Sequence, residues 1–122
     1  MAKYIIAHDV GTSGNKAVLV DTEGRVQGKC FEPYQTYHPS PGWVEQEPED
    51  WWRAVSKTTK LLLERTSVSP GDVMCITYAA QLLGIVPMDS KSGPLRRAII
   101  WMDCRAGEQA ERAMRKFLGP RV

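Results

Sequence analysis

The chain has 122 residues, a formal net charge of +2 and 43% hydrophobic residues, which is the composition of one ordinary folded domain spanning 1–122. No apolar run approaches the ~18 residues of a membrane span, and the N-terminus lacks a signal-peptide pattern, so we expect no membrane partner. Basic residues are densest at 94–97 and 112–116, where a solvated surface is the commoner explanation, so nucleic acid is not an expected partner. The cysteines have no metal or redox spacing and indicate reduced thiols in a cytoplasmic protein. They are Cys30, Cys75 and Cys104.

The first third of the chain predicts three strands joined by short turns. Apolar, β-branched runs occupy 3–9 and 15–21, and a third strand at 25–34 is weakened by Gly28 and ended by Pro33. Strands this close in sequence pair in antiparallel order, so we expect a three-stranded meander.

The remainder predicts a helix, three strands and a final helix. The first helix, 50–66, follows Pro48 and has Glu49 or Asp50 as its cap. Its expected apolar face is Trp52, Val55, Thr59 and Leu62. The later elements are a buried strand at 73–80, strands at 84–89 and 97–103, and a helix at 104–117. This order indicates an α/β fold, a mixed sheet with helices packed on it.

The segment "DVGTSGNK" (9–16) has two explanations. One is a hairpin turn, because Gly11 and Gly14 permit positive φ. The other is an anion cradle, in which backbone N–H groups, hydroxyls and Lys16 bind phosphate. Asp9 fits a cradle only if a divalent cation lies between it and the phosphate. The P-loop and dinucleotide-binding patterns are both absent.

Four segments carry a family resemblance. "DVGTSGNKAVLVD" (9–21) resembles the first phosphate motif of the sugar kinase, heat-shock protein and actin superfamily. "PGWVEQEPEDWW" (41–52), "ITYAAQLLGIVPMD" (76–89) and "AIIWMDCRA" (98–106) are similar to segments of the FGGY carbohydrate kinases, in the same order. The resemblance implies a ribonuclease H-like (actin-like ATPase) fold and covers only the N-terminal part of such a kinase.

The resemblance also implies a reaction and a set of site residues. FGGY kinases transfer the γ-phosphoryl group of ATP, with Mg²⁺, to a hydroxyl of a sugar or polyol. Asp9 would hold Mg²⁺ through water. The residues expected to bind the ATP phosphates are Gly11, Thr12, Ser13 and Lys16. Those expected to contact the sugar are Gln81, Leu82, Leu83, Trp101 and Asp103.

Several of these residues have simpler explanations. Trp101 in a strand is commonly a core residue, and Asp103 before a helix is commonly an N-cap. Leu82 and Leu83 depart from the polar pairs that xylulokinase-like and glycerol kinases carry there. Either the substrate is less polar at that end or other residues compensate. This departure argues against a plain glycerol kinase and a typical xylulokinase.

We expect structural roles, and no part in the chemistry, for two histidines and one tyrosine. His8 neighbours Asp9 on a strand and therefore faces the other side of the sheet, where we expect it to be packed. His38 is expected to be exposed in a proline-rich loop, and Tyr78 to be a core aromatic residue.

The resemblance places essential parts of the site outside this chain. The general-base aspartate and the adenosine-binding C-terminal domain would follow Val122, so the chain alone is expected to be inactive. Whether the enzyme forms a homodimer is left open. The competing hypotheses are a stand-alone sugar- or phosphate-binding module and another branch of the superfamily, such as an acyl phosphate-forming kinase or a chaperone ATPase. The segments 41–52 and 98–106 argue against that other branch.

Overall fold

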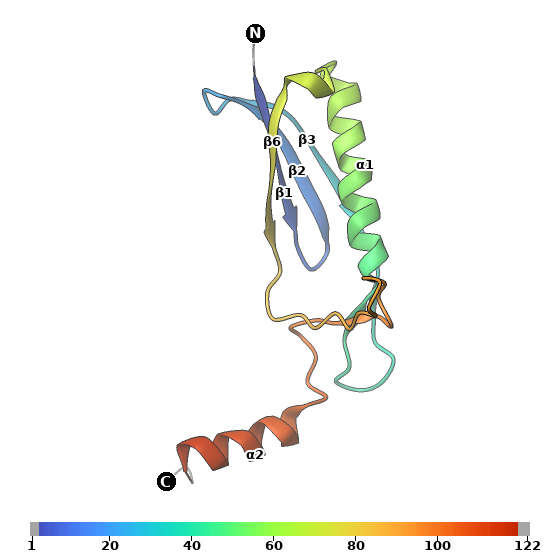
Figure 1. Cartoon of the computed structure of the whole chain (residues 1–122), viewed down its shortest axis with the longest axis vertical. Helices are drawn as coiled ribbons and strands as arrows, with labels where there is room; N and C mark the ends of the chain where they lie inside the picture. The colour runs from blue at the N-terminus through green and yellow to red at the C-terminus, as the bar shows by residue number, and fades with distance from the viewer. Residues whose placement is uncertain (1–2, 120–122) are drawn as a thin grey trace.

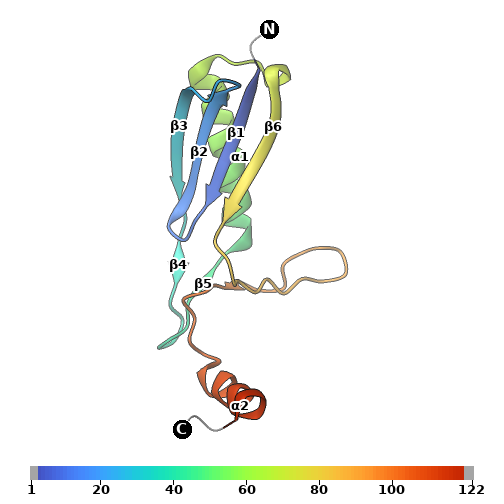
Figure 2. The ribbon, with the colours of Figure 1, turned by 90° about the vertical axis from the view of Figure 1, so that its left-hand side faces the viewer.

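The computed structural model describes residues 3–119 and contains a four-stranded main sheet. Its strands are β1 at Tyr4–Val10, β2 at Gly14–Asp21, β3 at Val26–Pro33 and β6 at Val73–Ala80. The first three strands pair in antiparallel order, and β6 pairs parallel with β1. The order across the sheet is β3-β2-β1-β6 (Figure 2). The predicted meander and mixed sheet are confirmed.

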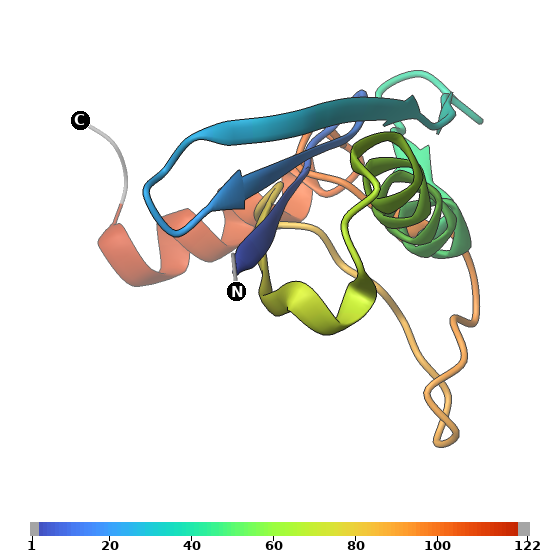
Figure 3. The same ribbon diagram turned by 90° about the horizontal axis from the view of Figure 1, so that it is seen from above.

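Helix α1, Pro48–Thr66, packs on one face of this sheet (Figure 3). Its Leu62 contacts a cluster that includes Ile6, Ala17 and Leu19, and none of the four is more than 1% exposed. Burying this apolar stripe against the sheet is what stabilises the helix, since an isolated helix of this length is marginal in water.

Gly28 allows α1 to lie close to β3. A Cβ atom at this position would lie 2.8 Å from Cγ2 of Thr66 and 3.4 Å from Cδ2 of Leu62. The first distance is too short for a real side chain. The glycine that weakens the strand pattern in the sequence is therefore required by helix–sheet packing.

A smaller sheet lies at the end of the main sheet where β1 and β6 finish; Figure 2 labels two of its strands, β4 and β5. It has three two-residue strands in the antiparallel order β4-β5-β7. They are β4 at Thr36–Tyr37, β5 at Glu45–Gln46 and β7 at Ala98–Ile99. This sheet brings the loop before α1 against the segment that precedes the last helix.

The last helix, α2, spans Gly107–Leu118 and extends away from both sheets (Figures 1 and 2). Its residues from 107 to 117 are exposed. Within residues 3–119, neither α1 nor α2 combines the length and the apolar character that crossing a membrane requires.

The start of α1 differs from the prediction. The helix begins at Pro48 with Glu47 as its N-cap, so Glu49 and Asp50 lie inside the first turn instead of capping it. Proline fits this first position because its missing N–H would have no partner there. The two carboxylates then face the positive end of the helix dipole.

The predicted strands at 84–89 and 97–103 are mostly absent. The first forms only isolated bridges, at Ile85 and Met88, and the second is reduced to β7. The Asp89 carboxylate accepts the backbone N–H groups of Lys91 and Gly93, at 2.8 Å each. This side-chain turn reverses the chain and leaves short arms that cannot extend a sheet.

The prediction that 73–80 is a buried strand is wrong as to burial. Seven of the eight β6 residues are exposed, including Ile76 at 45% and Tyr78 at 56%. Strand β6 is at the sheet edge, and α1 covers the face of its neighbours. In the part of the chain that the structure describes, no element packs over β6.

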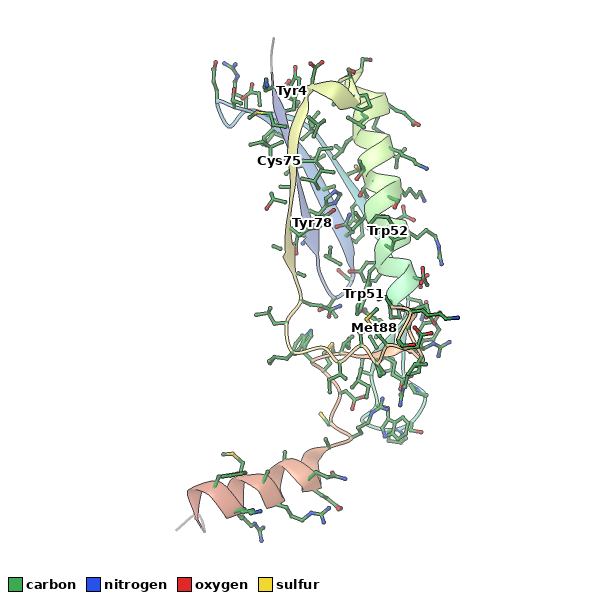
Figure 4. The ribbon with its side chains drawn as sticks, viewed as in Figure 1. Tyr4, Trp51, Trp52, Cys75, Tyr78 and Met88 are labelled. Carbon is green, nitrogen blue, oxygen red and sulfur yellow. The ribbon has the colours of Figure 1, made fainter. Side chains whose placement is uncertain are left out.

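The aromatic and histidine predictions have mixed outcomes. His8 is packed, at 2% exposure, and His38 is exposed, as predicted. Tyr78 is not a core residue; its ring stacks on His8 at 5.3 Å between centroids, on the α1 side of β6 (Figure 4). On α1, Val55 and Leu62 are buried as predicted, but Trp52 is 67% exposed. Ala54 and Thr58 take its place on the buried face.

A buried polar cluster joins the first two strands to α1. Asn15 Nδ2 donates to Thr58 Oγ1 at 2.7 Å and lies 3.0 Å from His8 Nδ1. His8 Nε2 lies 3.2 Å from Thr59 Oγ1. A neutral imidazole satisfies these contacts if Nδ1 accepts from the amide and Nε2–H donates to the hydroxyl. Burial lowers the pKa of His8, which favours this neutral form.

Acidification is expected to destabilise the protein through His8. The folded pKa lies below the ordinary value of 6.5, so the unfolded chain takes up a proton first as the pH falls. The stabilisation is complete above that value and is lost as the pH falls from it toward the folded pKa. Thermal unfolding followed by circular dichroism should give a lower Tm at about pH 5.5 than at about pH 7.5.

Two histidine variants separate this effect from general acid sensitivity. His8→Gln should remove much of the difference in Tm, whereas His38→Gln, at an exposed position, should retain it. A His8→Gln protein with the same pH dependence as the parent would contradict the assignment.

Candidate phosphate and acceptor site

The predicted site residues gather at the end of the main sheet where the parallel strands β1 and β6 terminate. The loop at 11–13 joins β1 to β2 there, and Gln81 directly follows β6. In sheets with parallel strands, ligands bind at the carboxyl ends of these strands. The small sheet brings Trp101, which follows β7, to the same end, where it bonds to Thr12.

The loop at 11–13 is a closed hairpin turn. The Gly11 N–H donates to the Gly14 carbonyl at 3.1 Å, and the Tyr34 hydroxyl donates to the Gly11 carbonyl. Burial and the charge of Asp9 raise the pKa of Tyr34 to about 12, so its hydroxyl stays protonated and keeps donating. The hairpin explanation of the sequence is confirmed, and it is compatible with a phosphate-binding role.

The loop glycines have a different physical role from the predicted one. Neither Gly11 nor Gly14 has a positive φ. A Cβ atom at Gly14 would lie 2.6 Å from the Glu32 carbonyl oxygen and from the Phe31 ring. Gly14 is needed because β3 passes too close for any side chain.

Asp9, Ser13 and Lys16 are the exposed polar residues of this hairpin. Asp9 and Lys16 are register partners, and Asp9 Oδ2 lies 3.5 Å from Lys16 Nζ. Both side chains are more than half exposed, so the pair is weak and open to a charged ligand. Within residues 3–119 there is no group of three or more His, Cys, Asp or Glu residues that could hold a metal ion. A lone carboxylate fits Mg²⁺, which keeps several waters and is completed by substrate phosphates.

Thr12 faces a different set of partners. Trp101 Nε1 donates to Thr12 Oγ1 at 3.0 Å, and that hydroxyl lies 3.4 Å from Gln81 Oε1. The structure therefore brings Thr12, Gln81 and Trp101 together. Trp101 is 55% exposed, so the alternative of a core tryptophan is wrong.

Gln46 holds this arrangement from beneath and was missed in the sequence. It is fully buried, and its amide donates to the Thr12 carbonyl at 2.6 Å and to Thr36 Oγ1 at 2.8 Å. Its Oε1 accepts from Gln81 at 2.7 Å and from Trp51 Nε1 at 3.0 Å. Both amide hydrogens and both lone pairs are thus used. Figure 4 shows Trp51 at the start of α1, next to the small sheet.

Asp103 is engaged inside the protein. Its side chain is 2% exposed, accepts the Val44 N–H and forms a two-point pair with the Arg105 guanidinium at 2.8 and 2.7 Å. The guanidinium holds the pKa of Asp103 well below its usual range. Asp103 also does not cap α2, whose N-cap is Ala106. Its bonds to the backbone N–H and the side chain of Arg105 hold a turn where the helix was predicted to begin.

Glu45 and Trp43 complete the surroundings of Arg105. Arg105 Nη2 donates to Glu45 Oε1 at 2.7 Å, and Arg96 donates to the same oxygen. The Trp43 ring lies 3.9 Å from the guanidinium carbon. These contacts fix the segment that carries Trp101 onto β5.

Leu82 and Leu83 are the most exposed of the predicted acceptor residues, at 77% and 88%. They follow Gln81 directly, and Leu83 has a φ of 61°. They thus lie beside the residues that bond to Thr12.

Comparison with known proteins identifies the family. The model of the FGGY family of carbohydrate kinases, N-terminal domain, matches residues 4–122, so the chain belongs to this family. Glycerol kinase from Brucella suis is 35% identical over 121 residues, which are 98% of this chain and 24% of that protein. Xylulose kinase from Staphylococcus epidermidis is 35% identical over 120 residues, with the same coverage. The chain thus spans about a quarter of the length of these relatives.

Solved structures support the same fold. The match with gluconate kinase from Lactobacillus acidophilus covers 95% of this chain and 23% of the kinase chain, with a TM-score of 0.87 and 26% sequence identity. A xyloylose kinase from Brucella ovis matches 91% of this chain with 24% of its own, at a TM-score of 0.80 and 30% identity. The predicted family and its actin-like ATPase fold are confirmed.

Removing the Gln46 amide is expected to destabilise the protein strongly. In Gln46→Leu, the Thr12 carbonyl and the side chains of Gln81 and Trp51 lose buried partners, so unfolding should become easier by about 3 kcal/mol. Urea denaturation at constant pH measures this. Gln35→Leu, at an exposed position, is the control and should change stability by less than about 0.5 kcal/mol. Equal effects of the two substitutions would contradict the role of Gln46.

Proposed function

We propose that this chain is the phosphate- and acceptor-binding part of an ATP-dependent kinase that phosphorylates a hydroxyl group of a sugar or polyol. The observation that carries the proposal is the position of the hairpin loop. It presents Asp9, Ser13 and Lys16 to solvent, while its Thr12 is bonded to Gln81 and Trp101. Phosphoryl transfer requires donor and acceptor to be held in line and in contact, and one loop touching both sides achieves this.

On the phosphate side, the loop supplies donors and charge. The Gly11 N–H is used within the loop, which leaves the N–H groups of Thr12 and Ser13 and the Ser13 hydroxyl for phosphate oxygens. Lys16 adds a positive charge. Asp9 would hold Mg²⁺ through water, and the metal, when bound, neutralises charge on the phosphates.

On the acceptor side, Trp101 and Gln81 are held in fixed orientations. The hydrogen bond from Trp101 Nε1 to Thr12 Oγ1 fixes the orientation of the indole ring. The flat face of this ring can pack against the C–H groups of a sugar. Gln81 uses one amide hydrogen on Gln46 and keeps the second for a hydroxyl.

We place the general base for the attacking hydroxyl in the part of FGGY kinases that this chain, at about a quarter of its relatives' length, does not cover. Asp103 and Glu45 are both held in ion pairs with Arg105, so neither is free to act as a base. The expected general-base aspartate therefore stays a prediction for that remaining part. The three free cysteines support a cytoplasmic location.

Asp9→Ala in the complete enzyme is expected to lower kcat by about 100-fold or more. Without the Asp9 carboxylate, Mg²⁺ would no longer be held where it neutralises the negative charge of the phosphates. Steady-state assays of ADP release over a range of Mg²⁺ concentrations measure this, with Tm as a check on folding. Glu23→Ala, also an exposed carboxylate, is the control and should retain full activity. Unchanged turnover in Asp9→Ala would rule out the metal role.

Trp101→Ala in the complete enzyme is expected to raise the KM for the sugar more than the KM for ATP, because only the acceptor loses a packing surface. Trp52→Ala, on the exposed side of α1, serves as the control and should alter neither constant. Equal increases in both KM values would indicate general loosening of the site instead.

ADP release also tests the alternative that this is a non-catalytic binding module. A complete protein that binds a sugar or ATP but releases no ADP with any sugar or polyol would favour that module over the kinase.

A further inference from the structure

Two exposed leucines stand beside the proposed acceptor site. Leu82 and Leu83 are 77% and 88% exposed, although leucine is among the residues most often buried. The neighbouring Trp101 is also exposed, at 55%, and Ile85 at 60%. An apolar surface thus adjoins the polar group formed by Thr12 and Gln81.

The backbone fixes these leucines in place. The Gln81 N–H donates to the Val10 carbonyl at 2.9 Å, which ties the start of their segment to β1. Ile85 and Ile99 exchange two backbone bonds, at 2.8 and 3.0 Å, which tie its end to β7. Between these ties, Leu83 takes a left-handed conformation at a φ of 61°, which is uncommon for a leucine. The two side chains are therefore presented from a short segment that is anchored at both ends.

The chemistry of this surface differs from that of the rest of the acceptor side. Gln81 and Thr12 can bond to hydroxyls, but a leucine side chain offers neither donor nor acceptor. A hydroxyl pressed against Leu82 and Leu83 would lose water and gain no partner, whereas a methyl group there would gain apolar contact.

We propose that the acceptor carries a hydrocarbon end, as in a deoxy sugar or a deoxy polyol, and that Leu82 and Leu83 contact this end. This inference rests on the proposed kinase function and names the class of its acceptor. The hydroxyl groups of the acceptor face Gln81, its C–H groups pack on the Trp101 ring, and the deoxy carbon faces the leucines.

The test compares matched acceptors in the complete enzyme. Ketohexoses and polyols are each paired with the compound that lacks one terminal hydroxyl, and ADP release is measured for every pair. In the pair with the highest activity, the deoxy member should have a kcat/KM higher by about 10-fold or more, the discrimination that one apolar contact can supply. A hydroxylated member that is equal or better would overturn the inference while leaving the kinase function intact. Failure of every acceptor to release ADP would overturn both.

Substitutions test whether the preference for the deoxy acceptor depends on Leu82 and Leu83. The double variant Leu82→Gln and Leu83→His should reduce the ratio of the two kcat/KM values to about one, because hydroxyl partners are restored. Leu95→Gln is the control: it is 67% exposed, lies twelve positions further along the connection between β6 and β7 and should keep the ratio. If the double variant lowers Tm and keeps the ratio, the leucines pack against other parts of the enzyme and the inference is wrong.

Discussion

The side-chain amide of Gln46 contacts four separate parts of the chain at the end of the main sheet. It binds the loop between β1 and β2, strand β4, the residue that follows β6, and the first turn of α1. A buried amide with all of its bonds made is rigid, because any displacement leaves a polar group without a partner in a low-dielectric site. The positions of Thr12 and Gln81, and through Thr12 that of Trp101, all depend on this one group.

Charge is distributed around this amide in two layers. The paired groups Glu45, Asp103 and Arg105 lie inside; Arg105 makes a two-point contact with Asp103 and a single close bond to Glu45. Asp9 and Lys16 lie outside, more than half exposed and loosely paired. The inner ion pairs of Arg105 hold a loop in place. In the loose outer pair, Asp9 and Lys16 can each leave the other to bind a charged ligand.

Local patterns in the sequence were sufficient for the elements that are stabilised by neighbouring residues. The hairpin strands, α1 and the packed His8 follow from apolar spacing and strand alternation. The glycine at position 14 was located correctly but for the wrong reason, because the approach of β3 cannot be read from the hairpin itself. The exposure of β6 was missed because an apolar strand pattern does not reveal whether anything covers it.

The sequence named the residues of the candidate site, whose role in ligand binding stays a prediction, but it did not indicate their contacts. Thr12 and Trp101 are 89 positions apart and Arg105 and Glu45 are 60 apart, and no local pattern encodes such pairs. The family resemblance named Thr12, Trp101 and Asp103 as site residues, but only the structure shows that Asp103 is bound to Arg105. Gln46 and Arg105 lie within the segments that resemble the family, so closer attention to these segments could have indicated them. Nothing in the local sequence marks Tyr34.

Among residues 3–119, no strand pairs with the outer edge of β6. An apolar edge strand with unpaired N–H and C=O groups is a template on which another strand can add. Met74, Ile76 and Tyr78 leave apolar surface along it, exposed by 55%, 45% and 56%. A preparation of residues 1–122 alone would therefore be prone to associate edge to edge as its concentration rises, and a lysine placed in β6 would oppose this by repulsion between copies.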